Sequence, residues 1–211
     1  MSDDASLYGN EVGTEFGYAI LDGAQHSSTI DQIKKKGYYQ MTEKELRTKL
    51  PFLEGKTVVD AYAGIGYWTL LLSKVVGPEG TVISIEPTPW NFSVLVENIT
   101  RCKWATNVIV LHNALTEETY KDNLPMYYNP DDAVNNSLVK FENGDAGEEL
   151  VVCKKLDDII EDSDAPYLMN FNIPNAKDLE RAIAGGELTI KIHTPYIISQ
   201  GNIIIDKPSV N

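Results

Sequence analysis

The chain has 211 residues and a mass of 23.5 kDa, which suits one α/β domain with a two-sided core and is short for two domains. Its 31 acidic and 18 basic residues give a net charge of -13, which repels phosphate backbones and makes nucleic acid an unlikely partner. Cys102 and Cys153 lie far apart in no metal-ligand spacing, so neither a metal site nor a disulfide scaffold is expected.

Residues 1–40 mix Gly, Ser, Asp and short apolar pieces without clean periodicity, and we interpret them as an irregular N-terminal arm of unassigned role. Its run from Lys34 to Lys36 is typical of a solvated face. The first residues carry no apolar signal segment, and no stretch approaches the roughly 18 apolar residues of a membrane span. We therefore expect a cytoplasmic protein without a membrane segment, whose single domain occupies residues 41–211.

A short helix over residues 42–50 is predicted by a capping box, and a buried strand, a glycine turn and a helix follow. Thr57–Ala61 is a β-branched run of the kind found in central parallel strands. Gly64 and Gly66 remove Cβ atoms where the backbone turns, so a ligand can approach it closely. Thr69 stands where a dinucleotide-binding G-x-G-x-x-G loop has its third glycine, which disfavours NAD or FAD.

The second strand is predicted at Thr81–Ile85, and Glu86 closes it. A carboxylate at this point can accept hydrogen bonds from both hydroxyls of a ribose. A helix then begins at an N-cap Thr88, and its apolar residues predict which face covers the sheet: Phe92, Leu95, Val96 and Ile99.

Val108–Leu111 is predicted as the third strand, and the alternation of strands and helices indicates a parallel sheet. His112 and Asn113 then lie at its carboxyl end, where ligands bind in open α/β sheets. Asn113 could hydrogen-bond an adenine there, although a polar loop after a strand is nearly as good an interpretation. Residues 121–147 are irregular in composition, and their role is not assigned.

Tyr167–Ile173 is predicted as the next core strand, which brings Asn170 and Asn172 to the same edge, and a helix follows over residues 175–183. Leu188–His193 alternates apolar and polar residues and is predicted as a strand with one solvated face. Residues 196–205 are predicted as an antiparallel hairpin, so the sheet ends mixed.

The segments Asp60-Ala-Tyr-Ala-Gly64-Ile-Gly66 and Ile85-Glu86-Pro87 resemble the first two motifs of class I S-adenosylmethionine-dependent methyltransferases. Further segments, at Leu124–Tyr128, Asn136–Leu138 and Lys155–Asp158, resemble the FkbM family of these enzymes. The resemblance covers about residues 40–195. It implies a Rossmann-like sandwich with a mostly parallel sheet, helices on both faces and an antiparallel C-terminal hairpin.

The resemblance also implies S-adenosylmethionine as cofactor and O-methylation of a sugar or another small hydroxylated metabolite. The positions that match the cofactor motifs, with weaker neighbours, are Asp60, Tyr62, Gly64, Gly66, Glu86 and Asn113. The general base is unknown, and the weak catalytic candidates are His112, Asn172 and His193. The sequence does not indicate an oligomeric state.

One segment departs from the family pattern. Where the family carries a Lys-Ile-Asp-Val-Glu-Gly-like sequence, this chain has Asn170-Phe-Asn-Ile-Pro-Asn175, so both carboxylates are absent. This leaves two alternatives open. Asn172-Ile173-Pro174 and the glycine turn also look like archaeal tRNA methyltransferases that act on guanine or its wybutosine derivatives. The lost carboxylates would also suit a non-catalytic methyltransferase-like binding protein.

Overall fold

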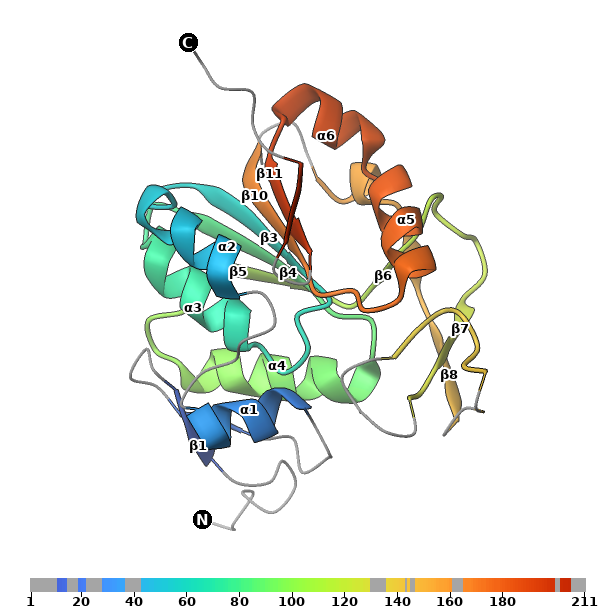
Figure 1. The fold of residues 1–211 in the computed structure, drawn as a ribbon, viewed down its shortest axis with the longest axis horizontal. Helices are drawn as coiled ribbons and strands as arrows, with labels where there is room; N and C mark the ends of the chain where they lie inside the picture. The colour runs from blue at the N-terminus through green and yellow to red at the C-terminus, as the bar shows by residue number, and fades with distance from the viewer. Residues whose placement is uncertain are drawn as a thin grey trace.

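The computed structural model describes residues 11–14, 19–21, 28–36, 43–129, 136–142, 144, 147–160, 165–199 and 202–205 (Figure 1). A six-stranded sheet runs through its centre in the order β12-β11-β10-β3-β4-β5. The strands are β3 (Thr57–Ala61), β4 (Thr81–Ile85), β5 (Val108–Leu111), β10 (Pro166–Phe171), β11 (Tyr196–Ser199) and β12 (Asn202–Ile205). All neighbours pair in parallel except β11 and β12, which are antiparallel. The predicted mixed sheet and C-terminal hairpin are confirmed.

Alternate residues of the strands point to two separate apolar cores, as expected for a sheet covered on both faces. Val58 belongs to the core on the side of α3 (Tyr67–Val76), together with the leucines of that helix. Val59 belongs to the other core, against which Ala182 of α5 (Ala176–Ala184) packs. Figure 1 shows α2 and α3 on one side of the sheet and α5 and α6 on the other. The α/β sandwich predicted from the sequence is therefore the observed fold.

The helix after Glu86 is α4 (Pro89–Arg101), and its buried face matches the predicted one in part. Its buried residues are Asn91, Val94, Leu95 and Asn98, whereas Val96 is 38% exposed. Leu95 is buried and Ile99 packs against the core as predicted, but a prediction that followed apolar residues only could not find the buried asparagines. Asn98 is fully buried because its side-chain amide donates to the Ile65 carbonyl at 2.8 Å, which satisfies a polar group inside the core.

The N-terminal segment contains regular structure where we expected an irregular arm. Its described elements are β1 (Glu11–Gly13), β2 (Ala19–Leu21) and α1 (Ser28–Lys36), with β1 and β2 paired antiparallel. Val12, Ile20, Ile30 and Ile33 are buried in the core on the α3 side. The sequence showed no clear periodicity in this segment, because each short element contributes only one or two of these buried apolar residues. The helix predicted over residues 42–50 is present as α2 (Glu43–Lys49), followed by a 3-10 turn, η2 (Leu50–Phe52).

The segment predicted as a strand at Leu188–His193 is a helix, α6 (Glu187–His193). The carboxylate of Asp157 accepts hydrogen bonds from the amides of Leu188 and Thr189 at 3.1 and 2.8 Å, which satisfies the first turn of this helix. Asp157 belongs to the 3-10 turn η3 (Leu156–Asp158), far away in sequence. A capping group from a distant segment thus overrides the alternating pattern of the helix itself.

The irregular stretch after β5 contains short pairs of strands on the α5 side. They are β6 (Ala114–Leu115) with β9 (Cys153–Lys154) in parallel, and β7 (Leu124–Tyr127) with β8 (Glu148–Val151) antiparallel. Ser137 then forms an isolated bridge to Tyr127, so that the chain returns to β7. This pairing brings residues 136–138 back against the body of the domain.

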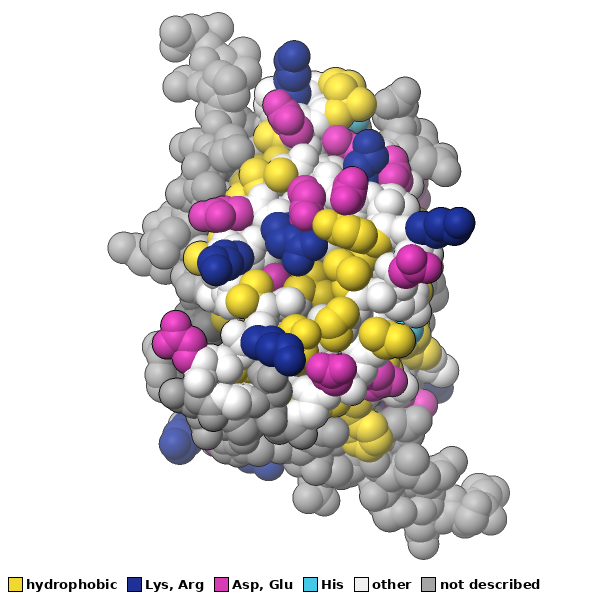
Figure 2. All heavy atoms as spheres, turned by 90° about the vertical axis from the view of Figure 1, so that its right-hand side faces the viewer, with side chains coloured by type: hydrophobic (Ala, Val, Ile, Leu, Met, Phe, Trp, Pro, Cys, Tyr) yellow, Lys and Arg dark blue, Asp and Glu magenta, His cyan; other side chains and the backbone are white. Residues whose placement is uncertain are grey.

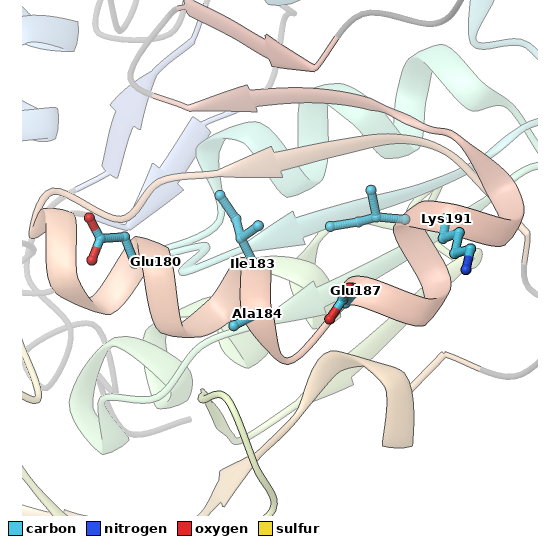
Figure 3. Close-up of a pocket in the computed structure, with 6 residues that line it drawn as sticks. Glu180, Ile183, Ala184, Glu187 and Lys191 are labelled. Carbon is cyan, nitrogen blue, oxygen red and sulfur yellow. The ribbon is translucent and has the colours of Figure 1, made fainter.

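The outer face of α5 and α6 carries an apolar surface surrounded by charged side chains (Figure 2). A hollow of about 540 Å³ lies on these helices (Figure 3), lined by Glu180, Ile183, Ala184, Glu187, Ile190 and Lys191. Leu188 and Ile192 of α6 are more than half exposed. None of the predicted cofactor residues lines this hollow. Among the described helices, none is long and apolar enough to span a bilayer.

Candidate functional site

The turn that follows β3 has an unusual backbone. Tyr62, Gly64 and Gly66 all have positive φ, at 58°, 57° and 97°. Positive φ is ordinary for glycine but strained for a tyrosine, and such strain is found preferentially at functional sites. The Gly66 amide donates to the Ala63 carbonyl at 3.0 Å, which closes the turn, and α3 begins at the next residue. The predicted strand, turn and helix are confirmed.

The two glycines of this turn meet different surroundings. A Cβ on Gly66 would lie 2.7 Å from Cδ1 of Leu95 in α4, so the absence of a side chain lets α4 pack against the turn. A Cβ on Gly64 would meet no described atom within 4 Å. The bare backbone at Gly64 therefore borders open space that a ligand can fill.

Glu86 lies at the carboxyl end of β4 and faces this turn. Its Oε2 accepts the Gly64 amide at 2.8 Å, and its Oε1 accepts the Thr88 amide at 2.9 Å. The side chain is only 2% exposed, and this burial raises the pKa of Glu86 to about 7 although the two amides stabilise the charge. The side chains of Thr88 and Asn91 also hydrogen-bond this carboxylate, so the group is firmly oriented at the strand end, where it suits the hydroxyls of a ribose.

Asp60, the fourth residue of β3, is fully buried beneath the turn. Its Oδ2 accepts the Thr69 hydroxyl at 2.6 Å, and the Thr69 oxygen lies 2.8 Å from the Ser84 hydroxyl oxygen. Burial raises the pKa of Asp60 to about 6 against the effect of these hydrogen bonds. Thr69, which replaces the third glycine of a dinucleotide loop, therefore ties α3 to β3 and β4.

Asn170 and Asn172, which stand in the segment that departs from the family pattern, also bind Asp60. Both side-chain amides donate to its Oδ1 at 3.0 Å. Asn170 is fully buried in β10, while Asn172 is partly exposed just beyond the end of that strand. Asn172 stands where the family pattern has an aspartate, so a neutral amide rather than a second carboxylate lies next to Asp60, which avoids placing like charges together. Asn172 lies at the predicted edge of the sheet.

His112 and Asn113 follow the carboxyl end of β5, as predicted. The His112 ring stacks on Phe92 at 4.3 Å between centroids, and its Nε2 lies 3.1 Å from the Pro87 carbonyl oxygen. These contacts hold the ring against α4. Asn113 is 8% exposed at the start of the turn to β6.

His193 does not lie at this edge, so the predicted position that made it a catalytic candidate was wrong. It ends α6, three residues before β11 begins at Tyr196. Because β11 runs parallel to β10, its first residue is at the amino end of the sheet, opposite Asn172. The choice depended on the predicted strand at Leu188–His193, which is a helix.

The structure adds four residues that the sequence did not single out as site residues. Thr88 binds Glu86 through its amide, and Asn136, Ser137 and Asp178 form a buried hydrogen-bonded group beside it. Only the likeness of Asn136–Leu138 to a family segment could have indicated them. Within the described ranges no group of three or more metal-ligating side chains comes together, and Cys102 and Cys153 are separate buried thiols.

Comparison with known proteins gives one family match. The model of the TRM5/TYW2 methyltransferase domain matches residues 28–127, a little under half of the chain. No curated protein matches the chain significantly.

Several solved structures match parts of the chain. The methyltransferase FkbM from Methylobacillus flagellatus KT is 21% identical with a TM-score of 0.53, over 75% of this chain and 36% of that one. TYW2 from M. jannaschii, solved in complex with AdoMet, is 30% identical with a TM-score of 0.35, over 50% of this chain and 45% of that one. Precorrin-6y C5,15-methyltransferase from Geobacter metallireducens GS-15 is 15% identical with a TM-score of 0.45, over 83% of this chain and 73% of that one. The match thus spans about a third of the FkbM structure's length.

Proposed function

We propose that the chain acts as a class I S-adenosylmethionine-dependent methyltransferase, a premise supported by the family model and the fold. It binds this cofactor at the carboxyl ends of β3, β4 and β5. S-adenosylmethionine is the cofactor of the class. The observation that carries the proposed position is Glu86, a buried carboxylate held by two backbone amides beside the open space at Gly64. In this position Glu86 binds the ribose hydroxyls.

The other residues of the edge take complementary roles in this proposal. The bare backbone at Gly64 lets the cofactor lie close to the turn, and Gly66 holds α4 in place behind it. Asn113 supplies an amide for the adenine. Asp60 is fully buried and acts indirectly, by holding the amide of Asn172 at the edge of the sheet. The residues present therefore fit the cofactor.

We propose a small hydroxylated metabolite, such as a sugar, as the acceptor. The resemblance to the FkbM family supports an oxygen nucleophile, and the net charge of -13 suits a small ligand better than a nucleic acid. Methyl transfer from a sulfonium requires mainly that donor and acceptor are held in line and that water is excluded. His112 is held by Phe92 and the Pro87 carbonyl, so we assign it no part in proton transfer.

A tRNA guanine or wybutosine-type acceptor is the second candidate. It is supported by the TRM5/TYW2 family model and by the sequence Asn172-Ile173-Pro174 at the site edge. It would require a local basic surface that overcomes the acidity of the whole chain. We rank it second for this electrostatic reason.

Calorimetric titration of S-adenosylmethionine and S-adenosylhomocysteine into the wild-type protein and Glu86→Ala tests the cofactor site. Each lost hydrogen bond to a charged acceptor is worth about 1.5 to 3 kcal/mol, so affinity should fall well over tenfold in the variant. The matched control is Glu79→Ala, which removes a carboxylate in the turn before β4, at the opposite end of that strand from Glu86. No binding to the wild type, or equal binding to Glu86→Ala, would contradict the proposal. Binding without turnover of any supplied acceptor would instead support a non-catalytic binding protein.

A further inference from the structure

Residues 136–138, which we call the strap, are held on three sides although they lie within an irregular stretch. Ser137 pairs with Tyr127 of β7 through two backbone hydrogen bonds, at 2.7 and 3.1 Å. The strap residues Asn136, Ser137 and Leu138 are 5%, 1% and 9% exposed. The strap is therefore a fixed part of the buried structure, and its polar groups have hydrogen-bond partners, as buried polar groups usually do.

One end of the strap reaches the residue that orients Glu86. The Asn136 side-chain amide donates to Oγ1 of Thr88 at 3.3 Å, and its Oδ1 accepts the Asn129 amide at 3.0 Å. Thr88 stands at the N-cap of α4 but makes no side-chain cap there. Its backbone amide donates to Glu86. The strap therefore fixes Thr88, and Thr88 fixes the carboxylate.

The other end of the strap is held by Asp178, in the first turn of α5. Its Oδ2 accepts the Ser137 hydroxyl at 2.6 Å and the Leu138 amide at 3.0 Å. The Asp178 side chain is fully buried. Its helix is capped separately by Asn175, whose side chain accepts the amides of Lys177 and Asp178. The Asp178 carboxylate is thus not needed to start α5 and is committed to the strap.

We propose that Asp178 is a positioning residue for the cofactor site, which acts through the strap and Thr88 to hold Glu86 in its ribose-binding orientation. This inference depends on the proposed function for its effect on affinity, but the linkage from Asp178 to Thr88 can be measured without any ligand. Replacing Asp178 by alanine leaves the Ser137 hydroxyl and the Leu138 amide buried without their acceptor, which releases the strap.

The test compares Asp178→Ala with Asp157→Ala, a matched control. Asp157 also accepts two hydrogen bonds, but from backbone amides of α6 and not from the strap. Hydrogen exchange should speed up at least tenfold at Leu138 and Thr88 in Asp178→Ala and stay unchanged there in Asp157→Ala. Affinity for S-adenosylhomocysteine should fall about fivefold to tenfold in Asp178→Ala only, as expected for the loss of roughly one hydrogen bond.

A double-mutant cycle with Asn136→Ala distinguishes linkage from general destabilisation. If Asp178 acts through the strap, the two substitutions together should weaken binding no more than the stronger one alone. Unchanged exchange at Thr88 in folded Asp178→Ala would overturn the proposal whether or not the protein binds cofactor. If Asp178→Ala does not fold, Ser137→Ala, which removes one of the two bonds, replaces it. Faster exchange at Thr88 with no cofactor binding to the wild type would support the linkage and contradict only the proposed function.

Discussion

At the scale of single residues, the buried carboxylates of the site make stability depend on pH. The pKa of Glu86 is raised from 4.5 to about 7, so the folded protein binds its proton more tightly than the unfolded chain does. The contribution of Glu86 to stability is therefore fully present below pH 4.5 and is lost as the pH rises through 7. A shift of this size corresponds to about 3 kcal/mol.

Glu86→Gln should remove this contribution. We expect the unfolding free energy of the wild type, measured with urea from pH 4.5 to 8, to fall with increasing pH more steeply than that of the variant. Asp60, whose pKa is raised to about 6, still titrates in both proteins and leaves a residual slope in the variant. Parallel pH profiles for the two proteins would show that Glu86 is not buried as a proton-binding group.

Gly66 is a second residue whose substitution has a definite expected cost. Its φ of 97° and the 2.7 Å approach of Leu95 both oppose a Cβ, and we expect Gly66→Ala to lower the unfolding free energy by about 2 to 4 kcal/mol. Gly55→Ala is the matched control, because Gly55 has a φ of 68° but no described atom within 4 Å of its Cβ position. It should cost only about 1 to 2 kcal/mol. Chemical denaturation measures both, and equal losses would refute a packing role for Gly66.

At the scale of elements, residue patterns in the sequence correctly predicted the strands and the turn whose conformation depends on neighbouring residues. The β-branched runs at Thr57–Ala61 and Val108–Leu111 are strands, and the glycine turn and Glu86 lie where their spacing indicated. What the sequence could not show is the partner of each polar group. Asn98 of α4 is buried with its amide bound to the Ile65 carbonyl, and Asp178 reaches the strap from a helix 40 residues further along the chain.

Helix α6 is the clearest example, and it carries the next prediction. Its alternating sequence favours a strand, yet Asp157 satisfies its first amides. We expect Asp157→Ala to lower the unfolding free energy by about 1 to 2 kcal/mol, as for the loss of a helix cap. Amide exchange should increase at Leu188 and Thr189. Asp158→Ala, at the neighbouring residue with no bond to α6, is the control, and equal effects of both substitutions would contradict the capping role.

At the scale of the whole molecule, net charge separates the two candidate acceptors. A chain with a net charge of -13 is repelled by tRNA, and only a local basic surface could reverse this. Among the described residues, Glu180 and Glu187 lie beside Lys191 around the hollow of α5 and α6, so positive charge on that face is opposed by negative charge. The visible charges in Figure 2 are likewise mixed.

We therefore expect no measurable binding of unmodified tRNA by fluorescence anisotropy at about 50 mM salt, a condition in which proteins that neutralise several phosphates bind strongly. Binding to small hydroxylated acceptors, tested with S-adenosylhomocysteine present, should be nearly independent of salt. Saturable tRNA binding that weakens steeply between about 50 and 200 mM salt would contradict the small-molecule acceptor, because that dependence reports counterions released from phosphates. It would favour the tRNA guanine reaction, with the cofactor still bound at Glu86.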